Sequence, residues 1–268
     1  MLRLPGSAHT CIVANTMNDK QYQASVAGMN ALVVGGSGGM GLALARALAG
    51  SDVRLTIHGR DPGRLRLAAD VCRSLSPSAR SIVTLAADLS GGNIPTELDR
   101  AARESDLLVL AYGPFVYRSL EKTTPEDWRL MALADLAVPG ILAGAAAVAM
   151  GKRGFGRILL FGGTRTDMVR GYKANAAYAS AKTGLGVLAK SVAAEFAGRG
   201  VSCAVICPGF VDTEYLDDDM RASLAARSPR GKLIDPSAIA GLGLYLLGGG
   251  MDLVNGAVIN ADEGLYAL

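Results

Sequence analysis

From residue 30 onward, short runs rich in leucine or β-branched residues alternate with segments of helical periodicity. Regular alternation of this kind predicts right-handed β-α-β units, and therefore a parallel sheet covered by helices on both faces. The expected strands are 31–35, 53–58, 81–86, 106–111, 156–161, 202–207 and 257–260, and the expected helices are 39–49, 62–75, 94–104, 125–151, 176–198 and 236–247. The sequence thus predicts a doubly wound α/β fold with about seven parallel strands.

The length of the chain fits a single domain of this kind. Of its 268 residues 50% are hydrophobic, enough for one large core, and no linker divides the sequence. Residues 1–29 are polar and lack the apolar stretch of a secretory signal, so we expect a loosely ordered extension followed by one domain over 30–268. The polar stretch 213–235 follows an expected strand, and we expect it to form a substrate lid over the carboxyl ends of the strands.

A glycine-rich loop lies between the first expected strand and the first expected helix. Residues 35–41 read GGSGGMG and fit two templates, GxGxxG at 36, 38 and 41 and GxxxGxG at 35, 39 and 41. Glycine permits a tight turn, lets the backbone approach a diphosphate closely, and directs amide groups and the helix N-terminus at the anion. The position of the loop in a β-α-β unit predicts a dinucleotide site.

The end of the second expected strand indicates which dinucleotide is bound. NAD sites place an acidic residue about 20 residues after the glycine loop, but this stretch reads His58-Gly59-Arg60-Asp61. Gly59 leaves room and Arg60 offers a cationic fork for a 2′-phosphate, so the sequence favours NADP over NAD. In the alternative interpretation Arg60 is solvated and Asp61 is an N-cap. Seven arginines, against three aspartates, lie between residues 41 and 80, either on a solvated face or near an anionic ligand: 46, 54, 60, 64, 66, 73 and 80.

Tyr178 and Lys182 are four residues apart in an expected helix, so their side chains share one face. The pKa of a free phenol, about 10, is too high for acid–base catalysis near neutral pH, and an adjacent ammonium is expected to lower it. The pair is therefore a candidate acid catalyst.

These segments together resemble the short-chain dehydrogenase/reductase family over nearly all of residues 30–265. The glycine loop is similar to the family's TGxxxGxG, with Val34 in place of the threonine, and 178–182 matches YxxxK. Further motifs resemble the adenine-side aspartate motif (87–89), the PGxxxT loop beside the nicotinamide (208–213) and the C-terminal strand motif (254–264).

The resemblance implies a Rossmann fold, an NAD(P)-dependent oxidoreductase, and specific site residues. Tyr178 would be the acid/base and Lys182 would also hold the nicotinamide ribose. The implied cofactor-binding residues are Gly35, Ser37, Gly38, Gly39, Met40, Gly41, Arg60, Asp88, Leu89, Ala111, Tyr112, Gly113, Tyr178, Lys182, Pro208, Gly209, Val211 and Thr213.

Two departures from the family pattern concern the catalytic groups directly. The family's NNAG is here Leu110-Ala111-Tyr112-Gly113, and the place of the catalytic serine falls on Gly163. Loss of one such hydroxyl donor costs about 10²–10³ in rate. Thr164 would supply a hydroxyl if the loop shifts by one residue, and Arg165 or a backbone amide are further candidate donors.

A third departure replaces the family's helix asparagine with Asp135. Pro139 has no N–H, so the carbonyl of Asp135 loses its helical partner and we expect a kink there. In the family this backbone carbonyl holds a water in a proton relay to the lysine. The Asp135 carboxylate either pairs with Lys182 or reaches solvent at the kink.

Composition excludes several other classes of function. A net charge of +3 is too small to indicate nucleic-acid binding. Four cysteines without CxxC spacing predict no metal site or disulfide framework and a cytoplasmic location, with Cys203 and Cys207 as buried thiols. The apolar stretch 130–150 is expected to be a buried helix, not a membrane span.

The sequence therefore predicts an NADP(H)-dependent reductase of a ketone or 3-oxoacyl carbonyl, with a small-molecule substrate that is either a simple carbonyl compound or an acyl thioester. The alternatives are a nucleotide-binding paralogue without turnover, acting as a regulator or assembly partner, and an enoyl reductase on the same fold. Alanine- and glycine-rich faces at 140–149 and 176–194 permit close helix approach, and with the family resemblance they predict a homo-oligomer, a tetramer or dimer.

Overall fold

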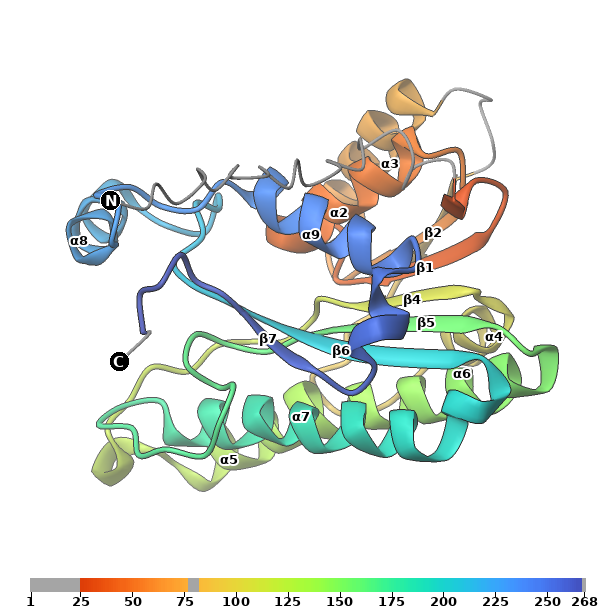
Figure 1. The fold of residues 1–268 in the computed structure, drawn as a ribbon. Coiled ribbons are helices and arrows are strands. Elements are labelled where there is room, and N and C mark those ends of the chain that lie inside the picture. Colours follow the sequence, from red (N-terminus) through yellow and green to blue (C-terminus); the bar gives the residue numbers. More distant parts are fainter. Residues whose placement is uncertain (1–24, 77–81, 267–268) are drawn as a thin grey trace, which may run out of the picture.

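The structure, a computed structural model, describes residues 25–76 and 82–266. Seven strands form one parallel sheet in the order β3-β2-β1-β4-β5-β6-β7 (Figure 1). The strands are β1 (Asn30–Val34), β2 (Arg54–Gly59), β3 (Ile82–Ala86), β4 (Leu107–Leu110), β5 (Gly156–Phe161), β6 (Val201–Pro208) and β7 (Val258–Ala261). No end differs from the expected one by more than one residue, so the predicted α/β fold is confirmed.

Helices connect the strands in the expected order. They are α2 (Gly39–Gly50), α3 (Pro62–Leu75), α4 (Thr96–Glu104), α5 (Pro125–Ala132), α6 (Val138–Arg153), α7 (Ala176–Phe196), α8 (Asp218–Arg227) and α9 (Pro236–Leu247). A π-helical turn, η2 (Leu133–Ala137), joins α5 to α6, and 3₁₀ turns occur at η1 (Leu120–Lys122), η3 (Ala197–Arg199) and η4 (Gly250–Val254). Helix α8 was not predicted, because its polar sequence has no buried residue and shows no apolar stripe.

The two faces of the sheet carry separate hydrophobic cores. Helices α2, α3 and α9 cover one face, and α4, α6 and α7 cover the other (Figure 1). On β1, Val33 belongs to the core that contains Leu44 of α2, whereas the preceding residue, Leu32, belongs to the core that contains Leu142 of α6. A parallel strand buried on both faces reads as a continuous apolar run, which explains the sequence of β1.

The expected extension and the expected thiols are described in part. Residues 1–24, with Cys11, lie outside the described residues, but Val26 is fully buried, so the packed domain begins before residue 30. Cys203 and Cys207 are buried free thiols, as predicted.

Pro139 produces a π-helical turn. Pro139 has no N–H to donate, and just before it the N–H of Val138 reaches back five residues to the Leu133 carbonyl. The expected irregularity at Asp135 is therefore a widened turn within a continuous helical stretch. The turn contains Asp135, whose side chain is fully buried.

The stretch Pro125–Arg153 is long and apolar enough to cross a membrane by length and composition alone, with a hydropathy of 1.8 in its most apolar window. Core helices pass the same test, and half of this window is buried inside the fold. Leu142, Ala146 and Met150 of α6 are fully buried. The stretch thus packs as a core helix, as predicted.

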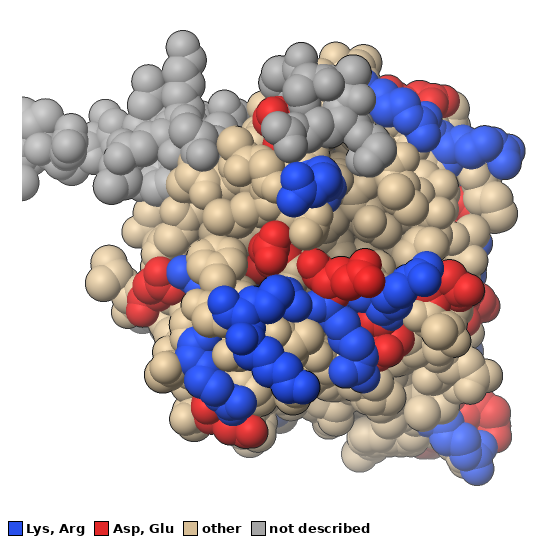
Figure 2. All heavy atoms as spheres, turned by 90° about the vertical axis from the view of Figure 1, so that its right-hand side faces the viewer, with Lys and Arg blue, Asp and Glu red and all other residues tan. Residues whose placement is uncertain are grey.

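The amino ends of the strands lie at the end of the molecule away from α8 (Figure 1). Figure 2 faces this end and shows lysines and arginines gathered with acidic residues between them. Two arginines near it connect separate elements. Arg157 of β5 donates to Asp252 of η4 at 2.6 Å, and Arg153 of α6 donates to the carbonyl of Ser105, after α4, at 2.6 Å. These two arginines therefore have structural partners.

Helix α3 offers a direct test of this packing. Leu65 is buried and Leu67, two residues on, is 68% exposed. We expect Leu65→Ala to lower the free energy of unfolding by about 2–5 kcal/mol, because it leaves a cavity. Leu67→Ala should change it by less than about 0.5 kcal/mol. Urea unfolding of both variants checks the pair, and equal losses would contradict the assigned buried face.

Candidate active site

The turn between β1 and α2 is closed by contacts that only glycine allows. Gly35 has φ +81°, and a Cβ there would lie 2.5 Å from the Ala111 carbonyl oxygen. A Cβ on Gly41, in the first turn of α2, would overlap the Gly35 carbonyl. The sheet order reverses between β1 and β4, so this turn lies beside the end of β4. Ligands of doubly wound folds bind at such a point.

The amino end of α2 already holds an anionic group. The N-cap residue Gly38 provides no side-chain cap, and the Gly39 N–H donates to both carboxylate oxygens of Glu214, each at 3.1 Å. Thr213 lies beside the same glycine, with its methyl carbon 3.6 Å from a Cβ placed on Gly39. The loop is thus shaped to receive negative charge, and its residues fit the diphosphate of a dinucleotide.

The residues at the end of β2 lie against the same loop. A Cβ on Gly59 would lie 2.5 Å from the Ser37 hydroxyl oxygen, so Gly59 makes room for that side chain. Arg60 is exposed, and Asp61 caps α3 by accepting from the Arg64 N–H at 2.7 Å. Asp61 therefore acts as an N-cap, and Arg60 is the basic residue at this strand end.

The neighbouring strand ends supply the remaining candidate cofactor residues. Asp88 accepts from the Ser90 N–H at 2.9 Å, and that bond is the largest factor lowering the pKa of Asp88, with Arg60 adding to it. Leu89 is fully buried. The Tyr112 ring packs edge-on against His58, whose pKa is lowered by burial. His58 is therefore a packed core residue.

Lys182 is buried in a cage of three oxygens. Its Nζ lies 2.9 Å from Oδ1 of Asp135 and donates to the carbonyls of Tyr112 and Phe161, each at 3.2 Å. The same Nζ is 5.8 Å from the ring centroid of Tyr178, so the two side chains share one face of α7. The cage joins the ends of β4 and β5 to the π-helical turn.

Asp135 has a raised pKa because it is buried, although Lys182 opposes the shift. Its Oδ2 has no hydrogen-bond partner among the described residues. Gly113 gives it space, because a Cβ at that position would overlap Oδ1. Of the two outcomes left open by the sequence, the structure has the carboxylate paired with Lys182.

Tyr178 occupies the space beside Gly163. A Cβ on Gly163 would lie 2.8 Å from the Tyr178 Oη, so a serine there would require the ring to move. Phe115 packs edge-on against Tyr178, with ring centroids 4.9 Å apart. Burial, followed by the charge of Asp135, raises the pKa of Tyr178. The prediction of a lowered pKa is therefore wrong for this structure, because burial, and after it the charge of Asp135, favours the neutral phenol.

The two threonines after Gly163 have different partners. The Thr166 hydroxyl is buried and both accepts from and donates to the Gly163 backbone, at 2.8 and 2.9 Å. The Thr164 hydroxyl donates to the carbonyl of Gly209 at 3.3 Å. Thr166 therefore closes the turn, and Thr164 connects it to the loop after β6.

That loop runs from the sheet to the glycine turn. The Gly209 N–H donates to the Ala261 carbonyl at 3.0 Å beside Pro208, the last residue of β6. Val211 forms an isolated parallel bridge with Ile234, which binds both ends of the predicted lid. The predicted cofactor residues that follow β1, β2, β3, β4 and β6 thus lie at one edge of the sheet.

Sequence reasoning missed two residues of this edge, Arg64 and Glu214. Glu214 directly follows the PGxxxT match, and Arg64 belongs to the basic stretch noted between residues 41 and 80. Neither sequence pattern indicated the contact between them, because it joins positions 150 residues apart.

Comparisons with known proteins agree with this geometry. Residues 35–266 match a family model described as Enoyl-(Acyl carrier protein) reductase. The chain is 30% identical to the 3-oxoacyl-(acyl-carrier-protein) reductase FabG of Escherichia coli strain K12 over 243 residues, which cover 89% of this chain and 98% of that protein.

Solved structures are similar over the same range. One described as a short chain dehydrogenase/reductase family protein has a TM-score of 0.81 and 27% identity, and covers 91% of this chain and 100% of that one. Another, from Beutenbergia cavernae, is assigned as an NAD(P) dependent gluconate 5-dehydrogenase with NADP bound at low occupancy. Its TM-score is 0.79 and its identity 29%, over 92% of this chain and 100% of that one. The chain therefore belongs to the short-chain dehydrogenase/reductase family of NAD(P)-dependent oxidoreductases.

Proposed function

We propose that this enzyme reduces a ketone or 3-oxoacyl carbonyl with NADPH, with Tyr178 as the proton donor. The observation that carries the proposal is the buried Lys182 cage, which sets the Tyr178 face of α7 against the strand ends beside the glycine loop. The similarity to FabG supports a 3-oxoacyl group as the substrate class.

The preference for NADP rests on the end of β2. Asp61 is engaged as the cap of α3, so no free carboxylate follows Gly59 to receive a ribose 2′-hydroxyl. Arg60 is exposed beside Ser37 and Gly59, where a 2′-phosphate would find a cation and a hydroxyl. The relative with NADP bound supports the same assignment.

When bound, the reduced nicotinamide supplies a hydride to the carbonyl carbon. Tyr178 donates its phenolic proton to the carbonyl oxygen as negative charge develops there. Its raised pKa keeps the phenol protonated, so the proton is present when the carbonyl binds. Lys182 holds the nicotinamide ribose and, with Asp135, returns a proton toward Tyr178.

Thr164 is the proposed hydroxyl donor to the reacting oxygen. Its present bond to the Gly209 carbonyl is long, at 3.3 Å, so little is lost when the hydroxyl turns to a substrate. Phe115, 59% exposed, continues toward the exposed ring of Tyr117 at a centroid distance of 6.1 Å. The two rings extend an apolar wall from Tyr178 and suit the carbon chain of a substrate.

The proposed enzyme is a homo-oligomer, a tetramer or dimer. The exposed apolar side chains of Ile141 and Val148 on α6 and of Val187 on α7 support this assembly. Gly140 and Gly144 have open space around them, where a second copy could approach closely.

Gly163 supports a second candidate, an enoyl reductase on the same fold. Reduction of a carbon–carbon double bond does not require a serine hydroxyl next to the tyrosine, and here the Tyr178 ring fills that space. NADPH oxidation with ketones, 3-oxoacyl thioesters and enoyl thioesters separates the two reactions. A paralogue without turnover would bind NADPH and oxidise it with none of them.

Removal of the phenol tests the acid. We expect Tyr178→Phe to lower kcat by about 10²–10⁴, because proton delivery to the carbonyl oxygen is lost. Tyr245→Phe on α9 removes a phenolic hydroxyl outside the site and should leave kcat unchanged. Turnover of the best substrate in the panel measures both, and full activity of Tyr178→Phe would exclude the proposed role.

Thr164 is tested by keeping or removing its hydroxyl. Thr164→Val should lower kcat by about 10²–10³, because one donor to the developing oxyanion disappears. Thr164→Ser should retain most of the activity, since it restores the hydroxyl. If both variants lose equal activity, the side chain serves packing only.

The charge of Asp135 is expected to set the alkaline limit of reduction. Activity requires protonated Tyr178 and is lost as the pH rises through its pKa, which burial raises most and the charge of Asp135 raises further. Asp135→Asn removes that negative charge, so the loss should begin about one unit lower in pH. Asp135→Glu keeps the charge as a control, and the pH profile of kcat gives the result. An unshifted alkaline limb in Asp135→Asn would contradict this role.

A further inference from the structure

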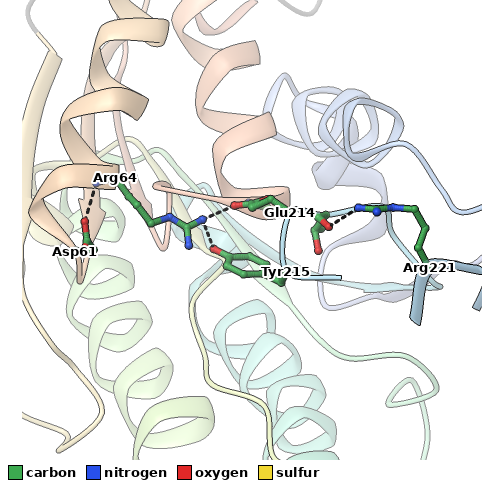
Figure 3. Close-up of polar contacts among 7 residues, drawn as sticks. Asp61, Arg64, Glu214, Tyr215 and Arg221 are labelled. Atoms are coloured by element: carbon green, nitrogen blue, oxygen red, sulfur yellow. Dashed lines mark hydrogen bonds and ion pairs between the residues drawn. The ribbon is translucent and has the colours of Figure 1, made fainter. Parts of the chain in front are cut away.

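The segment after β6 is bound across the glycine loop by a polar network. Arg64 of α3 forms an ion pair with Glu214 and donates to the Tyr215 hydroxyl at 3.0 Å (Figure 3). Its guanidinium carbon also lies 4.8 Å from the centroid of the Tyr215 ring. Glu214 in turn accepts from the Gly39 N–H, so three separate segments meet here.

The network fills the space above the loop. A Cβ on Gly38 would overlap the ends of Arg64, Glu214 and Tyr215. A dinucleotide diphosphate approaches this kind of loop from the same side, because the amides of the turn and the helix N-terminus face it. The carboxylate and the cofactor therefore compete for the same space and the same donor.

We propose that Arg64 is a phosphate ligand of the cofactor, and that Glu214 is the internal anion that Arg64 and the Gly39 amide exchange for that phosphate. The inference rests on the proposed use of NADPH and adds two residues that determine how tightly it binds. Nucleotide binding then requires the Glu214 carboxylate to leave the loop.

Because both side chains are exposed, breaking the Arg64–Glu214 ion pair costs little free energy. The side chains of Arg64 and Glu214 are 43% and 48% exposed, and exposed ion pairs contribute little to stability. A phosphate offers several acceptor oxygens and suits the planar fork of arginine. The guanidinium thus loses a weak partner and gains a stronger one.

The same exchange couples the predicted lid to the cofactor. Glu214 and Tyr215 lie shortly before α8, whose N-cap Asp217 accepts from the Met220 N–H at 2.7 Å. Arg221 of α8 donates to Asp212, which precedes Glu214, at 2.8 Å (Figure 3). When Glu214 leaves the loop, residues 214–215 therefore move between two contacts that remain, the Asp217 cap and the Arg221–Asp212 ion pair.

The first experiment removes the charge of Glu214. Glu214→Gln should bind NADPH about three- to tenfold more tightly, because the competing anion is gone. Asp219→Asn, which removes a charge from exposed α8, is the matched control and should leave affinity unchanged. Isothermal titration calorimetry measures both without turnover. Unchanged or weaker binding by Glu214→Gln would overturn the exchange.

The second experiment removes Arg64 in the Glu214→Gln background, so that no released carboxylate complicates the result. Arg64→Ala should then weaken binding about tenfold, because a charge-assisted bond to phosphate is lost. Arg66→Ala on the same helix is the control. Equal losses for NADPH and NADH assign Arg64 to the diphosphate, and a loss for NADPH alone assigns it to the 2′-phosphate. No loss for either would refute a phosphate ligand.

Failure of this inference is distinguishable from failure of the proposed function. If affinities shift as expected but no carbonyl is reduced, the proposed reaction is wrong and the exchange stands. If the wild type reduces a carbonyl but neither substitution alters affinity, the exchange is wrong. If no variant binds either nucleotide, both are wrong.

Discussion

The active-site edge of this fold depends on the burial of one positive charge. Lys182 lies inside the protein, where an unmatched ammonium is costly, so its surroundings must supply oxygens. Two come from backbone carbonyls at the ends of β4 and β5, and the third from Asp135. Gly113 and the π-helical turn give that carboxylate its place. One ion pair thus links α7, two strands and the α5–α6 stretch.

The same pair also determines the acidity of the site. An ammonium free of partners would favour the phenolate of Tyr178, but the Asp135 charge cancels that effect and burial favours the neutral phenol. A neutral phenol carries the proton that carbonyl reduction consumes, although its raised pKa makes it a weaker donor than a free phenol.

The fold could be predicted almost completely from the sequence, because each buried parallel strand is a continuous apolar run and each helix between them is amphipathic or capped. Helix α8 was not predicted, because none of its residues is buried and its sequence therefore has no apolar stripe. In the site, Pro139 marked the irregular turn, and spacing placed Tyr178 and Lys182 on one face. The pairing of Asp135 remained open, since spacing along the chain does not say which way a carboxylate turns.

Contacts between distant segments were beyond prediction for a related reason. Arg64 and Glu214 are each ordinary surface residues by local pattern, and only the folded loop brings them together over Gly38. Motifs are informative where chemistry fixes both residue type and spacing, as in the glycine turn. A half-exposed ion pair satisfies neither condition. Yet its position above the glycine turn means that the same donors bind the protein's own carboxylate or a phosphate, so the charge of the lid and the affinity for nucleotide cannot vary independently.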